Sequence, residues 1–416
     1  MPSESTHVPP LKVSIVGAGI AGLSAAIALR RNGHHVQIFE ASDVIEEVGA
    51  AIVVPLNAQC VLKTFGYSKE NLNSVNFHGI ESFDAVTGDR SSASWAISKE
   101  TPSLLVHRSD LHTELYRLAT GPGEGPPATI HLSSKVIECH PDQGLITLSD
   151  GPVISSDLIL GADGIASFVR TSVLGHVVKS VPSGLSNYRG LISMDAFEGR
   201  TDVKWIRDGI SGARMIVRRD GGGAFRMIFV YPCRGGALLN VVGIFKDPKQ
   251  NEPGESRPLR RTHEARANVL ETFSDFHPMF RPVLEVLDER VMKWQLRKVP
   301  TIPTWVRGHA ALLGDAAHGT LPTMAQGSAM AIEDAGALGV LLPAGTRRSN
   351  VPARLAGYES LRRERGDFIN QESLDQAIIP GKLGGFFRCE EMQGRILEFD
   401  AIQAAQEYFE QHFAVN

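Results

Sequence analysis

Three glycines and one acid near the start of the chain have the residue types and spacing of a dinucleotide site. Gly17, Gly19 and Gly22 form a GxGxxG pattern. In that pattern the first glycine permits a tight turn, the second lets the backbone approach a pyrophosphate, and the third allows close helix–strand packing. Glu40 follows, and its carboxylate can accept hydrogen bonds from both ribose hydroxyls. Because a 2′-phosphate would clash with this carboxylate, the pattern predicts FAD or NAD rather than NADP here.

Two further acids stand just after short apolar runs. Asp163 precedes Gly164 and follows the run 158–160, and Asp315 follows Gly314. An aspartate just past a strand end can bind a hydroxyl of a polyol chain, and small neighbouring residues let a planar ligand approach the backbone. Taken alone, each aspartate could instead be a helix cap, because aspartate is common at N-caps. Together with Glu40, the two acids predict one elongated ligand gripped by three turns.

The elements that position these residues begin with a strand, a helix and a second strand. Residues 11–16 are a short β-branched run typical of a buried parallel strand, and 20–32 form a helix of small residues that ends at Gly33. Residues 36–39 complete a βαβ unit. Further elements are expected over the following ranges: a helix at 109–119 with Ser109 or Asp110 as N-cap, a small antiparallel excursion at 128–160, a strand at 310–313, a helix at 327–342, and helices after Pro352.

The middle of the chain has a different pattern. Four short alternating strands, at 191–196, 213–218, 224–231 and 238–245, are separated by glycine-rich turns and predict a mainly antiparallel sheet. A helix is expected at about 262–276. On the sheet, Met215 and Val217 are expected to share one face, and Phe225, Met227 and Phe229 another. These side chains are candidates for a substrate wall, although ordinary core packing explains each of them as well.

Bulk composition excludes several classes of function. The chain has 416 residues and a formal charge of -4, so there is no electrostatic case for nucleic acid. No uninterrupted apolar run is long enough to predict a membrane span, and no targeting segment is apparent, so a cytoplasmic protein is expected. The cysteines form no CxxC pair and the histidines no HExxH spacing, so no metal site is expected.

The motifs together resemble those of the group A flavoprotein monooxygenases, the family of salicylate hydroxylase and para-hydroxybenzoate hydroxylase. The GxGxxG, Asp-Gly and Gly-Asp segments occur in register with three others, from about residue 11 to residue 370. These are His107–Leu111, Gly49–Ala58, and the stretch with Pro322, Gln326–Ser328 and Glu333–Asp334. The chain departs from the family pattern at Gly319, where a proline is usual, and in the loop 51–57, which lacks a second glycine and has Leu56 inserted.

The resemblance implies a role for each matching residue. Glu40 would hold the adenosine ribose, Arg108 the FAD phosphates or ribityl chain, and Asp315 a hydroxyl of the flavin chain. Asp163 and Gly164 would serve the pyrophosphate side and NAD(P)H. The remaining candidates for contact with the cofactor are Ala51, Gly314, Gln326, Gly327 and Ser328.

The resemblance also implies the fold and the reaction. The fold class is α/β: a Rossmann-like, GR2-type FAD-binding domain with an inserted, mainly antiparallel substrate sheet and a helical C-terminus. The domain ranges are a flexible tail at 1–10, an FAD-binding domain at 11–80, 101–182 and 295–345, a substrate domain at 81–100 and 183–294, and a helical segment at 346–416. NADH or NADPH would reduce FAD and leave. O₂ would then give a C4a-hydroperoxyflavin that hydroxylates or epoxidises an electron-rich aromatic compound or alkene.

Arg189, in the segment Tyr188–Gly190, is the candidate catalytic residue. A fixed cation in the gap between flavin and substrate would stabilise a phenolate or a developing oxyanion. A plain surface arginine is the competing interpretation. For the whole chain the alternatives are a flavin oxidase, a flavin-dependent halogenase, or a non-catalytic protein resembling the GDP-dissociation inhibitors. The sequence leaves the substrate, the choice between NADH and NADPH, and the oligomeric state open.

Overall fold

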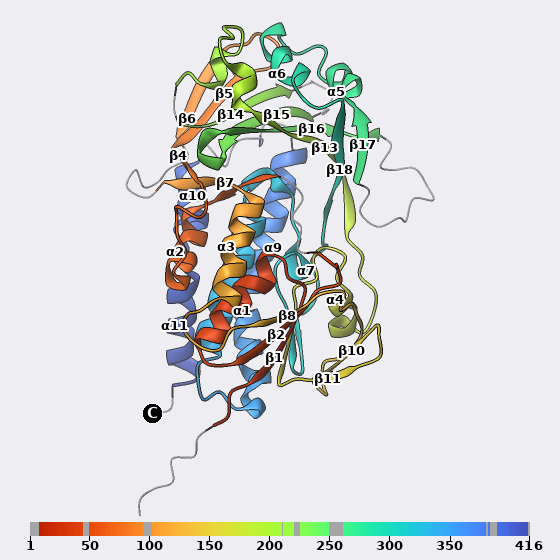
Figure 1. Ribbon diagram of the computed structural model, residues 1–416, viewed down its shortest axis with the longest axis vertical. Helices are drawn as coiled ribbons and strands as arrows, with labels where there is room; N and C mark the ends of the chain where they lie inside the picture. The colour runs from red at the N-terminus through yellow and green to blue at the C-terminus, as the bar shows by residue number, and fades with distance from the viewer. Residues whose placement is uncertain are drawn as a thin grey trace, which may run out of the picture.

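The computed structural model describes residues 8–44, 50–94, 102–209, 211–219, 225–248, 261–379, 382 and 389–414. Figure 1 shows two sheets at opposite ends of an elongated molecule, with the C-terminus at the end far from the larger sheet. This is the predicted α/β architecture, with an inserted sheet and a helical C-terminal part.

A six-stranded sheet carries the nucleotide-binding turns. Its order is β19-β20-β12-β1-β2-β8, and every pairing is parallel except that of β19 with β20. The central strands are buried almost throughout, as is typical of a parallel sheet covered on both faces. The strand bounds are β1 (Lys12–Val16), β2 (His35–Phe39), β8 (Thr129–His131), β12 (Leu158–Gly161), β19 (Val306–Arg307) and β20 (Ala310–Leu312).

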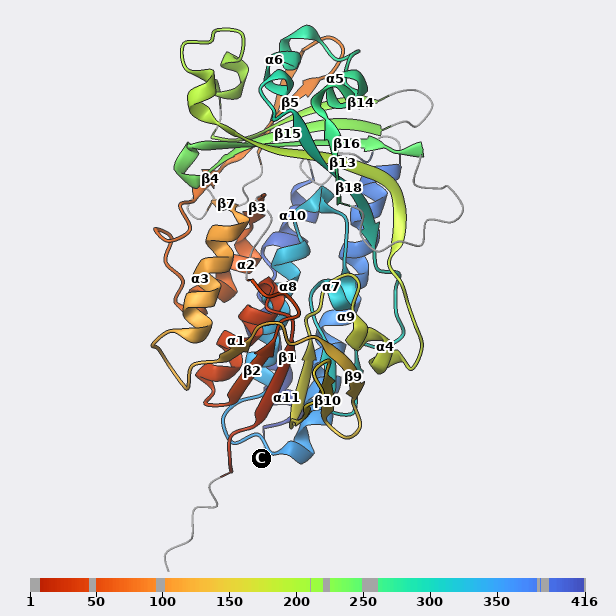
Figure 2. The same cartoon turned by 45° about the vertical axis from the view of Figure 1, so that its right-hand side comes forward.

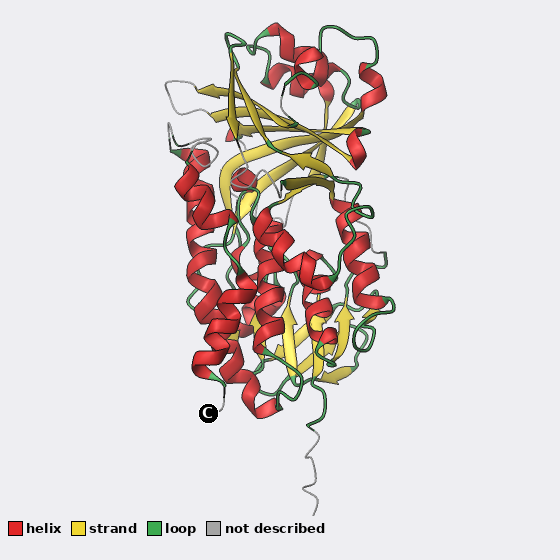
Figure 3. Cartoon of the chain, turned by 90° about the vertical axis from the view of Figure 1, so that its left-hand side faces the viewer, coloured by secondary structure: helices red, strands yellow, loops and turns green. Residues whose placement is uncertain are grey.

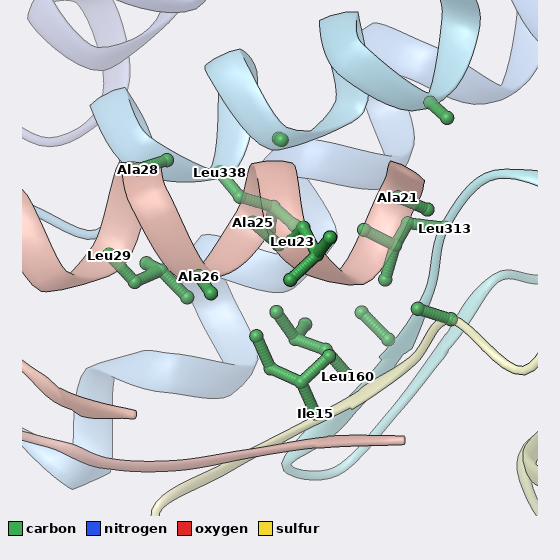
Figure 4. Packing of buried hydrophobic residues seen from close by; sticks show 14 of the residues in the cluster. Ile15, Ala21, Leu23, Ala25, Ala26, Ala28, Leu29, Leu160, Leu313 and Leu338 are labelled. Carbon is green, nitrogen blue, oxygen red and sulfur yellow. The ribbon is translucent and has the colours of Figure 1, made fainter. Parts of the chain in front are cut away.

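Small residues let helices pack closely on this sheet. Helix α1 (Ile20–Arg31) lies between the strands and helix α8 (Gly327–Leu341), and Figure 4 shows its alanines and leucines among the buried side chains. An added Cβ at Gly339 would stand 3.0 Å from the Cβ of Ala28. The two helices therefore approach too closely for larger side chains to be accommodated without adjustment.

The other helices lie along the sheet, as Figure 3 shows from a second direction. Those packed on or near it include the long helix α9, which belongs to the C-terminal part. Their bounds are α2 (Leu56–Phe65), α3 (Arg108–Thr120), α4 (Phe168–Leu174), α7 (Asp315–His318), α9 (Val351–Ile378), α10 (Glu390–Leu397) and α11 (Ala401–His412).

There are also two three-stranded sheets, one beside the six-stranded sheet and one next to the larger sheet (Figure 1). One contains β9 (Val136–His140), β10 (Leu145–Leu148) and β11 (Val153–Ser155), which are antiparallel. The other has the order β3-β7-β4, with β3 (Ala51–Val54), β7 (Ser103–His107) and β4 (Val75–Phe77). The predicted antiparallel excursion at 128–160 is therefore confined to β9–β11, because β8 and β12 pair in parallel within the main sheet.

The inserted sheet has eight strands in the order β17-β18-β13-β16-β15-β14-β5-β6, and Figure 2 shows it spanning the top of the molecule. All its pairings are antiparallel except that of β14 with β5. Its bounds are β5 (Gly79–Asp84), β6 (Arg90–Ser94), β13 (Val181–Ser193), β14 (Gly212–Arg219), β15 (Phe225–Cys233), β16 (Leu238–Lys246), β17 (Arg261–Ala265) and β18 (Arg290–Lys298). Helices α5 (Arg266–Thr272) and α6 (Arg281–Glu285) cover its outer side.

Three local expectations are wrong. The helix expected at 262–276 begins only at Arg266, because the preceding residues form β17 and pair with β18. The strand expected at 191–196 is the end of β13, which covers Val181–Ser193 and gives way to a 3₁₀ turn at Met194. The N-cap of α3 is His107, whose side chain accepts a hydrogen bond from the Ser109 N–H.

Candidate active site

The glycine-rich turn has the close contacts that its spacing predicts. Gly17 has φ +103°, and an added Cβ there would lie 2.5 Å from the Ala162 carbonyl oxygen. An added Cβ at Gly22 would lie 2.0 Å from the Gly17 oxygen. Gly19 is different, because no heavy atom lies within 4 Å of its added Cβ. The turn is therefore packed on the side of the sheet and open at the start of α1.

Glu40 organises this turn from the end of β2. One carboxylate oxygen accepts the Ala18 N–H at 2.8 Å, and the other accepts the Ser42 N–H at 2.9 Å. Each oxygen keeps a lone pair for another donor. Contact with a ribose remains a prediction.

The carboxylate of Asp163 caps helix α4. Its oxygens accept hydrogen bonds from the Ser167 hydroxyl at 2.6 Å, the Phe168 N–H at 2.7 Å and the Val169 N–H at 3.0 Å. Burial raises the pKa of Asp163, and these hydrogen bonds oppose that rise. The neighbouring Ala162 and Gly164 line a cavity to which Gly19, Asp315 and Arg189 also contribute, whereas the Asp163 side chain is not part of its lining.

Buried Arg170 holds the Asp163 turn against the Asp315 turn. Its guanidinium donates to the carbonyl oxygens of Ile165 at 2.8 Å, Val178 at 3.0 Å and Ala316 at 3.0 Å. Sequence reasoning missed this role of Arg170. Three carbonyl partners on separate segments could not be inferred from spacing.

Asp315 is the first residue of α7, and its exposed side chain lines the cavity. The preceding Gly314 has φ +59°, and an added Cβ would lie 2.9 Å from that of Ala21 in α1. This contact brings the α1 turn and the α7 turn together. The turns at Gly19, Gly164 and Asp315 therefore line one cavity, whereas the side chains of Glu40 and Asp163 are not part of its lining.

The start of α8 also lines the cavity, through Gly327 and Ser328. No side chain caps this helix end and its first turn has no acid. Its N–H groups and the positive end of its dipole are thus available to an electron-rich group. Gln326 is fully buried instead, where its Oε1 accepts a hydrogen bond from Asn57 at 2.9 Å, and it is not part of the lining.

Residues of β3 and α3 complete the cofactor side of the cavity. Ala51, Ile52, Val53 and Arg108 all line it. Gly49, part of the same family motif, lies outside the described residues.

The opposite wall belongs to the eight-stranded sheet. It consists of Arg189 and five largely apolar residues of β15 and β16, namely Met227, Phe229, Tyr231, Val242 and Ile244. The cavity has a volume of about 320 Å³, within the range of small-molecule sites. Sequence reasoning missed Tyr231, although it lies two residues beyond Phe229 and so on the same strand face.

The expected division of the sheet into two faces is wrong. Met215 pairs with Phe229 and Val217 with Met227, and directly opposite residues of an antiparallel pair share a face. Met215 and Val217 line a neighbouring cavity next to β5 rather than the one that contains Arg189.

Arg189 is a cation in this mostly apolar wall. Its Cζ lies 5.4 Å from the centroid of the Trp294 ring, and its Nε is shielded from solvent with no hydrogen-bond partner among the described residues. Desolvation lowers the pKa of Arg189, and nearby Arg108 lowers it further, against an opposing effect of Tyr231. Two neighbouring guanidinium groups in one cavity favour a ligand with negative charge.

A buried ionic network joins helices α8 and α9 beneath the cofactor side of the cavity. Arg362 of α9 contacts Glu333 at 2.7 Å and Asp334 at 2.9 Å, while Arg365 contacts Glu333 at 2.8 Å. Asp334 also accepts hydrogen bonds from His318 at 2.7 Å and from the Gly314 N–H at 2.9 Å. Asp334 therefore fixes the turn that presents Asp315.

The network should give stability a measurable pH dependence. Burial raises the pKa of Asp334, but the charges of His318 and Arg362 and two hydrogen bonds lower it from 3.8 to about 2. Because the folded-state pKa is the lower one, this stabilisation is present above about pH 4 and is lost as pH falls toward 2, by about 2 kcal/mol. In urea unfolding at a series of pH values, the difference between wild type and Asp334→Asn should shrink over that window. Exposed Asp195→Asn is the control, and a constant difference for Asp334→Asn would contradict the assignment.

The chemistry of these residues fits FAD. The open start of α1 suits a pyrophosphate, Glu40 and Asp315 suit hydroxyl groups, and the glycines and alanines around the cavity leave room for a planar ring. Across the described ranges, no cluster of three or more potential metal-ligating side chains is found. No described helix is long and apolar enough to cross a membrane.

Comparison with known proteins adds independent findings. Residues 143–373 match the family model described as an FAD binding domain, and residues 15–52 match a model described as an NAD(P)-binding Rossmann-like domain. The chain is 40% identical over 402 residues to hispidin-3-hydroxylase of Neonothopanus nambi, covering 94% of each chain. It is 31% identical over 380 residues to salicylate hydroxylase of Pseudomonas putida, covering 88% of this chain and 85% of the relative. A solved salicylate hydroxylase substrate complex has the same fold, with a TM-score of 0.77 at 22% identity, covering 96% of this chain and 98% of the other.

Proposed function

The chain belongs to the FAD-dependent monooxygenases, an enzyme family that uses FAD and NAD(P)H, and we propose that it hydroxylates a small, electron-rich aromatic compound bound as an oxyanion beside Arg189. The relatives do not favour an oxidase, a halogenase or a GDP-dissociation-inhibitor-like binding protein. Epoxidation of an alkene is a second reaction that the same site chemistry would serve. All four cysteines are free, which suits work in the reducing cytoplasm.

The position of Arg189 is the observation that carries the proposal. It lies in a wall otherwise formed by largely apolar side chains, across the cavity from the residues that would hold FAD. A desolvated cation there would bind and orient a phenolate and stabilise the negative charge that makes the ring electron-rich. Bound FAD supplies the chemistry of accepting a hydride from NAD(P)H and activating O₂.

The other residues of the site bind, orient and exclude water. Glu40, Arg108 and Asp315 would hold the extended cofactor, and the start of α8 would place positive potential beside its ring. Phe229, Val242 and the neighbouring apolar side chains would confine a flat substrate and keep water out.

A substrate screen tests the function. Hispidin and salicylate, the compounds in the names of two relatives, are suitable first candidates with both NADH and NADPH. The expected result is stimulated oxidation of the nicotinamide with uptake of one O₂ and a product heavier by one oxygen atom. Stoichiometric peroxide without product, for every aromatic compound offered, would contradict the proposal.

Arg189→Met should lower kcat by about a hundredfold, the usual cost of removing one preorganised oxyanion donor. FAD occupancy should be unchanged, because the replaced group lies on the substrate sheet. Arg290→Met, an exposed arginine of the adjacent strand β18, is the matched control. Steady-state turnover with the flavin absorbance recorded in the same sample is the measurement. Unchanged turnover for Arg189→Met would exclude this role.

A further inference from the structure

One residue at the edge of a sheet is held by side chains from the other half of the molecule. Ala51 of β3 pairs with His107 of β7, and the Arg108 N–H donates to the Ala50 carbonyl at 2.7 Å. In an antiparallel ladder this pattern directs the N–H and C=O of Ala51 away from β7. Ala51 is buried and β3 is an edge strand, so both groups need partners elsewhere.

Both partners come from the β15–β16 hairpin. The Tyr231 hydroxyl donates to the Ala51 carbonyl at 2.6 Å, and the Ala51 N–H donates to Asn240 Oδ1 at 3.3 Å. Tyr231 and Asn240 are directly opposite each other in the ladder, so they share a face. Burial raises the pKa of Tyr231, which keeps its hydroxyl protonated and able to donate. The two side chains thus bind the backbone N–H and C=O of a single residue, Ala51.

The tip of the same hairpin makes a second attachment. Arg234 contacts Asp110 at 2.9 Å and the Ser109 hydroxyl at 3.1 Å, in the first turn of α3. The Gly235 N–H donates to the Asn73 carbonyl at 2.7 Å. Arg234 has φ +48°, a conformation that is uncommon for a residue with a side chain. A conformation of this kind persists where surrounding contacts impose it.

We propose that this hairpin, residues 231–240, is a latch, and that Tyr231 and Asn240 are positioning residues that set the β3 wall of the cavity against the cofactor and thereby couple NAD(P)H oxidation to hydroxylation. The proposal rests on the function proposed above. Ala51, Ile52 and Val53 line the cavity from β3, and Tyr231 lines it from β15. The latch therefore joins the cofactor side and the substrate side at the cavity itself.

Loss of the latch would alter the outcome of the reaction. In the coupled reaction, ArH + NAD(P)H + O₂ + H⁺ gives ArOH + NAD(P)⁺ + H₂O. In the uncoupled reaction, NAD(P)H + O₂ + H⁺ gives NAD(P)⁺ + H₂O₂, with the same electron pair taken from the nicotinamide. Removing either side chain leaves a buried backbone group without its partner and loosens the wall that keeps water out, and water access promotes side reactions.

The test uses the full-length holoenzyme with Tyr231→Phe, Asn240→Leu and the double variant. Hydrogen exchange in the peptide containing 51–54 should accelerate by about threefold or more in Asn240→Leu, in line with the loss of one hydrogen bond. Iodide should quench the bound flavin more strongly, and the share of NAD(P)H recovered as peroxide in the presence of hispidin should rise. Because both side chains hold one residue, the double variant should exceed the larger single effect only slightly. Tyr116→Phe, which removes the hydroxyl of an exposed tyrosine of α3 outside the cavity lining, is the control.

The results separate three questions: whether the latch exists, whether it affects coupling, and whether the proposed function is right. Wild-type exchange at 51–54 in Asn240→Leu would overturn the latch, whatever the activity. Faster exchange with unchanged iodide quenching and unchanged peroxide would overturn its role in coupling. If the wild type hydroxylates no compound in the substrate screen, the proposed function fails, while exchange and quenching still decide whether the latch exists.

Discussion

Arg362→Met should lower the free energy of unfolding by about 3–5 kcal/mol, the range measured when one partner of a buried ion pair is removed. Arg362 is 1% exposed, and its guanidinium contacts both Glu333 and Asp334, which are fully buried. Its charge helps to lower the pKa of both carboxyl groups against the effect of burial. Methionine fills similar space but leaves two acids in the core with less compensation. Urea unfolding near neutral pH, without added FAD, is the measurement.

An exposed ion pair provides the matched control for this experiment. Arg281 contacts Glu285 at 2.7 Å, and both side chains are about half exposed. Arg281→Met should therefore change the free energy of unfolding by less than about 0.5 kcal/mol. If Arg362→Met lowered the free energy of unfolding no more than Arg281→Met does, the network around Arg362 would not be a principal support of the α8–α9 contact.

The parts of the site whose geometry is set by residues close together in the chain could be predicted from the sequence. The turn at Gly17 and the strand before it depend on residues close together in the chain, where spacing alone sets backbone geometry. The same holds for Asp315, which follows a buried strand directly. Runs of small residues likewise placed the helices at 20–32 and 327–342 within one residue of their observed ends.

The parts that depend on distant partners could not be predicted. Residues 262–265 form a strand because β18 lies beside them, and nothing in their own pattern distinguishes this from a helix start. Gln326 is at its expected place in the chain, yet its side chain turns to Asn57, on a different helix. For Asp163, local sequence allowed both a ligand contact and a helix cap, and the structure places its carboxylate in the cap.

The latch illustrates the same limit at the level of whole sheets. The alternation of β15 indicates that Tyr231 faces the same way as Phe229, but not that its hydroxyl reaches the edge of another sheet. Only the arrangement of the two sheets brings Ala51 between Tyr231 and Asn240. Residues that join two halves of a molecule are hard to identify from the sequence, because their hydrogen-bond partners lie in a distant segment of the chain.

Gly19→Ala should weaken FAD binding by about a thousandfold while leaving the apoprotein as stable as wild type. No heavy atom lies within 4 Å of an added Cβ at Gly19, and its φ of -74° suits alanine. The space that the methyl group would enter is where a pyrophosphate approaches the start of α1. Losing two charge-assisted hydrogen bonds of about 1.5–3 kcal/mol each accounts for an effect of this size. Fluorescence titration with FAD and thermal unfolding of the apoprotein measure the two quantities.

Gly22→Ala separates contact with the cofactor from packing of the fold. Its Cβ would lie 2.0 Å from the Gly17 carbonyl oxygen, a backbone atom that can move only if the turn is distorted. This variant should lose about 1–3 kcal/mol of apoprotein stability as well as FAD affinity. Gly123→Ala is the control for glycine replacement, because the nearest atom to its added Cβ lies 4.0 Å away and it lines no part of the cavity. Wild-type FAD affinity in Gly19→Ala would mean that the pyrophosphate binds away from α1, and the assignment of the other cofactor-binding residues would fail with it.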